Sequence, residues 1–206
     1  MNDRAKTVSL KDSMCFDFIL FFDCEYTCWE NSLKTLWSDP RYPSELLQIG
    51  IAVYNIKEKR YSKEFSSFVR PEINPHLSSY CKNLLKISQE EIDNAKKFPV
   101  VSSQISEFIN PYSNNSMYIC SWGDDYNRIS DNAFRSNTND PFVTLPRMNL
   151  MEEAIKVFGI QGNHILRDDL KEKLGLKPVI NRHDAIADAL DLLDIMDALK
   201  KHIIKH

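Results

Sequence analysis

The sequence lacks the features that would place it in several broad classes of protein. It has no large excess of one charge, because 26 basic and 29 acidic residues give a net charge of −3 over 206 residues. A strongly basic surface, the simplest indication of nucleic-acid binding, is therefore missing, although this charge still allows a local basic groove. The most apolar stretch, residues 16–22, is interrupted by Asp17 and followed by Asp23, so we expect no membrane span and no signal peptide.

Paired cysteines are also missing. The five cysteines are an odd number and form no CxxC motif: Cys15, Cys24, Cys28, Cys81 and Cys120. A disulfide framework is not expected, and a reduced, cytoplasmic protein without membrane contact fits better. Cys24 and Cys28 lie four residues apart, but no matching pair of cysteines or histidines follows to complete a zinc site. Small buried hydrophobic residues are the simpler interpretation of these cysteines.

The composition is that of an ordinary globular protein. Hydrophobic residues make up 43% and charged residues 27% of the chain, and no repeat or Gly/Ser linker stands out. A mass of 24.0 kDa suits one compact domain. Because residues 1–13 are polar and mixed in charge, we expect a flexible N-terminal arm over residues 1–14 and a single domain over residues 15–206. The sequence leaves a homo-oligomer open.

Strand patterns come first along the chain, and helical patterns dominate its end. Short apolar or alternating runs predict strands over residues 16–23, 46–54, 60–69 and 117–122. Apolar spacing of three and four predicts helices over residues 77–85, 99–109, 146–158, 165–174 and 183–203, with further helices after Ser88 and near Asp124. The order predicts an α/β protein with a mixed sheet flanked by helices.

The first predicted strand ends in two acidic residues, Asp23 and Glu25. Residues two apart on a strand share a face, so both carboxylates point to the same side of the sheet. Two adjacent like charges are unfavourable unless a cation lies between them, and magnesium prefers such oxygen ligands. Taken alone, this pair is a weak indication, and a solvated loop edge is the simpler interpretation.

Two further acidic segments follow. Asp124 and Asp125 come directly after the strand that ends near Trp122, where they could cap a helix or face a ligand site. His183 and Asp188 flank the start of the last helix, and they reach one site only if His183 lies in the preceding loop. Small residues at 185, 187 and 189 would allow this helix to lie close to the sheet.

These segments, in this order, resemble the motifs of the DEDDh family of 3′–5′ exonucleases. FDCEYTCWE at 22–30 resembles the first motif, SWGDD at 121–125 the second and HDAIAD at 183–188 the third, and the match covers residues 16–199. ELLQIGIAVYN at 45–55 resembles the family's second strand. The branch that is most similar contains sporulation-inhibitor-like and RNA-interference-enhancing exonucleases. The resemblance implies an RNase H-like fold.

The resemblance also implies roles for the matching residues. Asp23, Glu25 and Asp188 would hold two divalent ions, Mg²⁺ or Mn²⁺, with Asp125 supporting one of them, and His183 would be the general base. Tyr26, Thr27 and Trp29, which follow the first carboxylates, are candidates for contacts with the terminal nucleotide, and Arg182 beside His183 is a candidate phosphate contact. The partner would be the 3′ end of a single-stranded nucleic acid.

The second motif departs from the family pattern W-G-x-x-D. Position 126 is tyrosine, and the acids fall earlier, at Asp124 and Asp125, with Asn127 after them. We assign the position to Asp125, with Asp124 and Asn127 as the alternatives.

The function expected from the resemblance is a metal-dependent 3′–5′ exonuclease that acts on RNA more readily than on DNA and releases nucleoside 5′-monophosphates. A catalytically weak exonuclease-like module that binds nucleic acid or protein is the first alternative, because the second motif is irregular. A phosphoesterase that acts on small nucleotides is the second.

Overall fold

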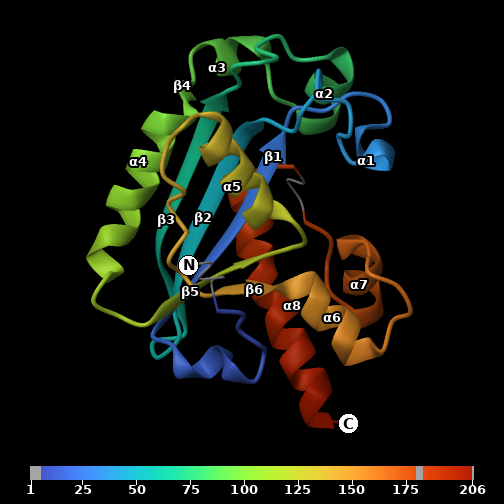
Figure 1. Cartoon of the computed structure of the whole chain (residues 1–206). Helices are drawn as coiled ribbons and strands as arrows, with labels where there is room; N and C mark the ends of the chain where they lie inside the picture. The colour runs from blue at the N-terminus through green and yellow to red at the C-terminus, as the bar shows by residue number, and fades with distance from the viewer. Residues whose placement is uncertain (1–5, 180–182, 206) are drawn as a thin grey trace.

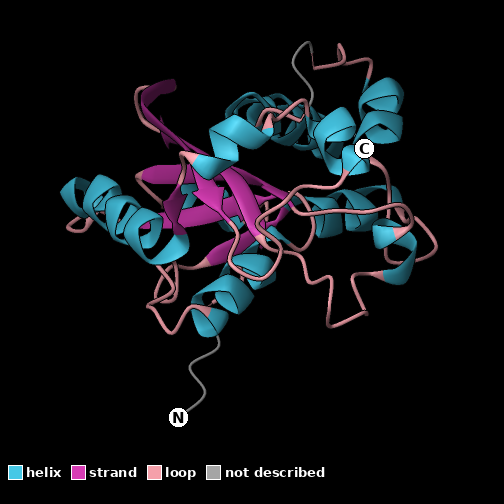
Figure 2. Cartoon of the chain, turned by 90° about the horizontal axis from the view of Figure 1, so that it is seen from above, coloured by secondary structure: helices cyan, strands magenta, loops and turns pink. Residues whose placement is uncertain are grey.

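The computed structural model describes residues 6–179 and 183–205, and they form a six-stranded mixed sheet with helices on both faces (Figures 1 and 2). The strand order in space is β4-β3-β2-β1-β5-β6. The central strand β1 (Phe18–Tyr26) pairs antiparallel with β2 (Leu46–Asn55) and parallel with β5 (Met117–Ser121). The α/β class with a mixed sheet is therefore confirmed.

The remaining elements surround these three strands. The outer strands are β3 (Arg60–Arg70), β4 (Lys96–Lys97) and β6 (Arg147–Asn149). The helices are α1 (Ser32–Thr35), α2 (Ser79–Leu85), α3 (Gln89–Asp93), α4 (Phe98–Ile109), α5 (Asp125–Arg135), α6 (Leu150–Phe158), α7 (Arg167–Leu174) and α8 (Ala185–Lys205), with 3₁₀ turns at Asp12–Cys15 and Asn110–Tyr112. None of the described helices has the length and apolar character needed to span a membrane.

Apolar residues on both faces of β1 explain why it is the central strand. Leu20 and Phe22 pack on one face, in a cluster with residues of α4 and α5. Ile19 and Phe21 pack on the other, in a cluster with residues of α6, α7 and α8. A strand that is covered on both sides needs this nearly continuous hydrophobic run.

The helix α8 lies directly on the sheet, because one strand residue there has no side chain. A Cβ atom added at Gly50 of β2 would come within 2.3 Å of the backbone of Ala185 and Ile186. Ala185 and Ala189 are fully buried, as the small-residue pattern predicted, whereas Ala187 is only half-buried. The side chain of Gln48 joins the same two elements, since its Oε1 accepts from the amide of Ala185 at 3.2 Å.

The N-terminal segment differs from the flexible arm predicted for residues 1–14. Thr7 forms a bridge with Arg147 of β6, and Val8 and Leu10 are 2% and 4% exposed within the α6–α8 core cluster. Residues 7–13 therefore pack on the domain, and that part of the prediction is wrong. Their polar composition concealed two apolar residues that reach the core; residues 1–5 lie outside the described residues.

The sequence also misassigned residues 146–149. They were expected to begin a helix, but Arg147–Asn149 form the edge strand β6, parallel to β5, and α6 starts only at Leu150. The side chain of Asn149 caps that helix by accepting from the amides of Met151 and Glu152. Elsewhere the capping box at Ser88 and Glu91 is confirmed.

The cysteines are free thiols, as expected. Four of them are buried, namely Cys24, Cys28, Cys81 and Cys120, whereas Cys15 is exposed. The interpretation as small buried hydrophobic residues holds for these four.

Candidate active site

The site forms where β1 changes from apolar to acidic residues on a single face. Ile19 and Phe21 pack with α8 in the core, and the next two residues on this face are Asp23 and Glu25. Both are nearly buried, at 8% and 9% exposure. The alternation of the strand thus delivers two carboxylates to the start of α8, as the sequence predicted.

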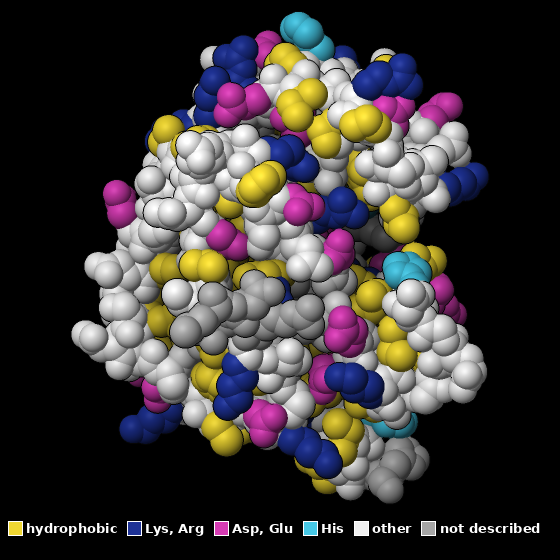
Figure 3. Space-filling view, viewed as in Figure 1, with side chains coloured by type: hydrophobic (Ala, Val, Ile, Leu, Met, Phe, Trp, Pro, Cys, Tyr) yellow, Lys and Arg dark blue, Asp and Glu magenta, His cyan; other side chains and the backbone are white. Residues whose placement is uncertain are grey.

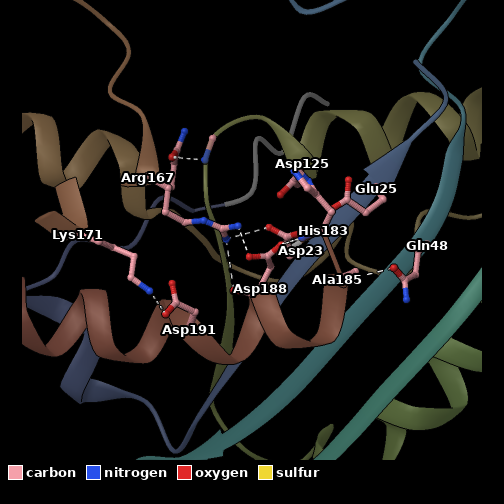
Figure 4. Close-up of polar contacts among 12 residues, drawn as sticks. Asp23, Glu25, Gln48, Asp125, Arg167, Lys171, His183, Ala185, Asp188 and Asp191 are labelled. Atoms are coloured by element: carbon pink, nitrogen blue, oxygen red, sulfur yellow. Dashed lines mark hydrogen bonds and ion pairs between the residues drawn. The ribbon is translucent and has the colours of Figure 1, made fainter. Parts of the chain in front are cut away.

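Asp188 completes the cluster from the first turn of α8. It is 1% exposed, and one carboxylate oxygen from each of Asp23, Glu25 and Asp188 lies within 4.8 Å of the others (Figure 4). Two segments far apart in the sequence are thereby brought to one point. Three buried carboxylates at this separation repel one another strongly unless they are protonated or share a cation.

Burial and the charges of neighbouring carboxylates both raise the pKa values of the cluster. Burial raises the pKa of Asp23 well above its ordinary value, and the charge of Asp125 raises this pKa further. The pKa values of Glu25 and Asp188 are also raised, mainly by burial. The opposing influences come from two bases, because His183 lowers the pKa of Glu25 and Arg167 lowers that of Asp188.

Of the residues considered for the second motif, Asp125 is the one that faces the other carboxylates. Its charge acts on Asp23, and the charge of Glu25 acts on it in turn. Burial raises the pKa of Asp125 to about 8. Asp124 is largely exposed and pairs with Asn127 and Arg128 of its own helix, so neither Asp124 nor Asn127 occupies this position.

Tyr26 holds Asp125 in place. The hydroxyl of Tyr26 donates to Oδ1 of Asp125 at 3.1 Å, and its ring packs against the α4–α5 core cluster. The sequence predicted a nucleotide contact for Tyr26, but both parts of this side chain are used within the protein. Its position at the end of β1 instead links the first acidic segment to the second.

His183 lies in the loop before α8 and faces the carboxylates from the side. Its Nδ1 is 3.5 Å from Oε1 of Glu25, and its backbone amide donates to Oδ2 of Asp188 at 2.9 Å. Its φ of 68° lies in the left-handed region, which is unfavourable for residues other than glycine. This turn orients the imidazole, which is partly exposed, toward the acidic cluster.

The structure adds one residue that the sequence analysis missed. Arg167, at the start of α7, directs its guanidinium into the cluster, where Nη1 lies 3.3 Å from Oδ1 of Asp23 and Nη2 contacts Oδ1 of Asp188 (Figure 4). Its side chain is only 12% exposed. The charged sequence RDDLKEK around it is typical of a solvated helix and gave no indication of this contact.

The other predicted substrate contacts have different outcomes. Thr27 is buried, and its hydroxyl donates to the carbonyl of Pro43 and accepts from the amide of Glu45, so its side chain does not face a ligand. Trp29 is half-buried and its ring lies 4.8 Å from that of Tyr42, which is itself 42% exposed. Arg182 lies outside the described residues.

The residues of the cluster fit a divalent metal ion. Asp23, Glu25 and Asp188 offer hard oxygen donors from β1 and the first turn of α8. Asp125 lies outside this group of three, but its charge is close enough to raise the pKa of Asp23. Among the groups described, one permanent cation, Arg167, and one histidine face these four acids. Mg²⁺ is held in this way, by a few carboxylates and water.

Comparisons with known proteins agree with this arrangement. The exonuclease family (RNase_T) matches residues 20–196 of the chain. A 3′–5′ exonuclease, eri1 of Schizosaccharomyces pombe, is 32% identical over 108 residues, which cover 52% of this chain and 34% of that protein. The 3′–5′ exoribonuclease 1 of Homo sapiens is 30% identical over 94 residues, which cover 46% of this chain and 25% of that protein. The match therefore spans about a third and a quarter of these two relatives.

Solved structures show the same fold. The nuclease domain of 3′hExo, described as a DEDDh family member bound to rAMP, has a TM-score of 0.79 and 21% identity, covering 90% of this chain and 93% of that one. A 3′-exonuclease described in complex with a histone mRNA stem-loop has a TM-score of 0.78 and 21% identity, covering 90% of this chain and 64% of that one. With a family match over most of its length and the acidic motifs gathered at one end of β1, the chain belongs to the exonuclease family.

Proposed function

We propose that this protein is a metal-dependent 3′–5′ exonuclease. It would hydrolyse phosphodiester bonds at the 3′ end of single-stranded nucleic acid, with RNA preferred over DNA, and release nucleoside 5′-monophosphates. The observation that carries the proposal is the convergence of Asp23, Glu25 and Asp188 within 4.8 Å, with the charge of Asp125 acting on Asp23 from outside this group. RNA is favoured because the human relative is named an exoribonuclease.

The carboxylates would hold two Mg²⁺ or Mn²⁺ ions. Asp23, Glu25 and Asp188 are the proposed ligands, and Asp125 would support one ion directly or through water. When bound, such ions stabilise the attacking and the leaving oxygen of an in-line displacement. The protein would keep the ligands fixed, because α8 packs on β2 through Gly50 and Gln48, and β2 pairs with β1.

His183 would act as the general base. Its Nδ1 faces Glu25 at 3.5 Å, which leaves Nε2 to take a proton from the attacking water. A histidine suits this task because its ordinary pKa lies close to neutral pH. Glu25 would orient the imidazole and stabilise its protonated form.

The substrate would lie across a groove that borders the start of α5. The groove has a volume of about 680 Å³ and runs from Leu36, beyond α1, to Lys156 of α6, passing Gly123 and Asp124, which directly precede Asp125. The pair of Trp29 and Tyr42, near α1, offers an aromatic surface on which bases can stack without sequence preference. Basic and acidic side chains are interspersed over the face drawn in Figure 3, which fits a local contact with a strand end rather than a broad phosphate-binding surface.

One observation favours the alternative, a catalytically weak binding module. Arg167 already contacts Asp23 and Asp188, and a permanent cation on these oxygens would lower their affinity for metal ions. A module that never binds metal would show no dependence on divalent ions in any assay.

The direct test is degradation of 5′-labelled single strands of RNA and DNA of identical sequence, with Mg²⁺, with Mn²⁺ and with EDTA. We expect stepwise shortening from the 3′ end that requires the divalent ion and is faster on RNA. His183→Ala should lower the rate by ~10²–10⁴-fold. His76→Ala, which changes an exposed histidine outside the cluster, should leave the rate unchanged.

Two results would contradict the proposal. If neither strand is shortened in the presence of either ion, the binding module is the better description. If His183→Ala loses only a small part of the activity, His183 is not the general base.

A further inference from the structure

Arg167 connects the two segments that carry the proposed metal ligands. Its Nη1 lies 3.3 Å from Oδ1 of Asp23 on β1 and 3.4 Å from the backbone carbonyl oxygen of Asp188 on α8. Its Nη2 forms an ion pair with Oδ1 of Asp188. Because the side chain is 12% exposed, these contacts are made largely away from solvent, where charge interactions are strong.

The direction of Arg167 is fixed by the packing of α7 on α8. One turn further along α7, Lys171 forms a second buried ion pair, with Asp191, which follows Asp188 by one turn on α8 (Figure 4). Between the two cations, Leu170 is fully buried in the α6–α8 core cluster. The apolar contact of Leu170 therefore holds α7 on α8, and on either side of it Arg167 and Lys171 each pair with a different acid of α8.

Arg167 and a divalent ion would use the same two carboxylates. The guanidinium contacts Oδ1 of Asp23 and Oδ1 of Asp188, and both residues belong to the group whose ligand atoms lie within 4.8 Å of one another. A bound ion and a guanidinium at these oxygens would also repel each other. The guanidinium and the ion can each supply the positive charge that buried carboxylates need, but they cannot both occupy these contacts at the same time.

We propose that Arg167 is a built-in counter-cation of the acidic cluster and competes with one of the two divalent ions, so that binding of this ion moves the guanidinium off Asp23 and Asp188. The inference rests on the metal site of the proposed function and adds a residue that sets the affinity of that site. Arg167 acts here through the carboxylates and is a positioning residue. Arginine suits this role because its charge persists at any pH at which the carboxylates ionise.

The test is the affinity for Mn²⁺, measured by calorimetry on the full chain, for wild type, Arg167→Met and Lys171→Met. Removing a competing cation should raise the affinity of Arg167→Met by ~10-fold or more. Lys171→Met is the matched control, because it removes a buried positive charge from the same helix without removing a contact to Asp23 or Asp188. Its affinity should stay within ~3-fold of that of wild type.

A second measurement uses the wild-type protein alone and does not depend on the folding of a variant. The NMR signal of the Arg167 Nε–H group, assigned with Arg167→Lys, should shift during a Mg²⁺ titration and follow the occupancy of the weaker ion. In the absence of divalent ions Arg167→Met should also melt at a lower temperature than wild type, and saturating Mg²⁺ should reduce this difference.

The outcomes separate this inference from the proposed function. Equal affinities of wild type and Arg167→Met, an equal gain in Lys171→Met, or an Arg167 signal that does not change at saturating Mg²⁺ would each overturn the competition while leaving the metal site intact. If none of the three proteins binds Mn²⁺ or Mg²⁺, the metal site itself is wrong.

Discussion

At the scale of single residues, Asp125 is subject to opposing influences. Burial and the charge of Glu25 raise its pKa, while the hydrogen bond from Tyr26 lowers it, and the result is a value of about 8. A carboxyl group of this kind is protonated over much of the range in which ordinary aspartates are charged. The two neighbouring acids in the sequence, Asp124 and Asp125, therefore have unlike environments, one exposed and one half-buried.

This difference predicts how stability depends on pH without divalent ions. The folded pKa of Asp125, about 8, lies above its ordinary value of 3.8, so the folded protein holds the proton more tightly than the unfolded chain. The contribution to the free energy of unfolding is therefore fully present below the ordinary pKa and is lost as the pH rises through about 8. Urea unfolding in EDTA should give a lower free energy of unfolding at about pH 9 than at about pH 5, and this difference should be smaller in Asp125→Asn than in wild type. The same loss in Asp125→Asn as in wild type would contradict the assignment.

A second prediction at this scale concerns Trp29. If its ring stacks on a base, Trp29→Ala should weaken substrate binding by ~1–3 kcal/mol and raise KM with little change in kcat. Phe134→Ala, which removes an aromatic ring that is 87% exposed and has no part in the proposal, is the control. Steady-state kinetics on a short RNA would measure both, and an unchanged KM in Trp29→Ala would remove this residue from the substrate surface.

The residues of the site differ in how well the sequence reveals them. Asp23, Glu25, Asp188 and His183 stand in short motifs next to predicted element ends. Strand periodicity places Asp23 and Glu25 on one face, whereas their meeting with Asp188 and His183 is implied by the resemblance to the DEDDh family. Arg167 stands in no such motif. The sequence indicates its contact only in that Arg167 and Lys171 lie about one helical turn apart, as do their partners Asp188 and Asp191. Such a match has meaning only once α7 is known to pack on α8.

At the scale of elements, the contact between β2 and α8 decides whether the site forms. The backbone of α8 at Ala185 approaches Gly50 so closely that a Cβ atom there would lie 2.3 Å away. The same helix carries Asp188 and follows the loop of His183. A displacement of its first turn would therefore move a proposed ligand and the proposed base together.

Gly50→Ala tests this contact. The added methyl group should destabilise the protein by ~1–3 kcal/mol or more and lower Mn²⁺ affinity, because it pushes α8 off the sheet. Gly159→Ala is the control, since a Cβ atom at Gly159 meets nothing within 4 Å and only its φ of 59° opposes the substitution. Thermal unfolding and calorimetry would measure the two effects, and normal ion affinity in Gly50→Ala would show that the fit is not critical.

The elements that the sequence predicted well have strong local patterns. The predicted strands over residues 16–23 and 46–54 are mostly apolar runs, and α4 and α8 have one buried stripe each. The edge strand β6 was missed because it has three residues, and its partners are β5 and Thr7, far away in the sequence. No local pattern distinguishes such a strand from the first turn of the helix that follows it.

At the scale of the whole molecule, the N-terminal segment closes one end of the α6–α8 core cluster. Leu10 is 4% exposed, and its amide donates to Oε2 of Glu153, a buried carboxylate of α6. The segment also extends the edge of the sheet, where Thr7 bridges to Arg147. The N-terminal segment therefore packs against elements that lie more than a hundred residues further along the sequence.

This packing predicts a stability effect without a direct effect on catalysis. Leu10→Ala should lower the free energy of unfolding by ~2–5 kcal/mol, because it opens a cavity in the core. Met14→Ala, at a side chain that is 59% exposed, should change it by less than ~0.5 kcal/mol. Below the melting temperature the rate per folded molecule should be equal in both variants and wild type. If the free energy of unfolding of Leu10→Ala equals that of wild type, the N-terminal segment is better described as a flexible arm.

Asp188 uses its two carboxylate oxygens for different partners, and this has a consequence for how the molecule can fail. Oδ1 faces Arg167, whereas Oδ2 accepts from the amide of His183, whose backbone has an unfavourable φ of 68°. When Asp188 is displaced, the turn at His183 loses the hydrogen bond that offsets its strain and relaxes toward ordinary backbone angles. The proposed cation ligand and the proposed base therefore depend on each other, and we expect loss of Asp188 to remove the cation site and to misplace the imidazole at the same time.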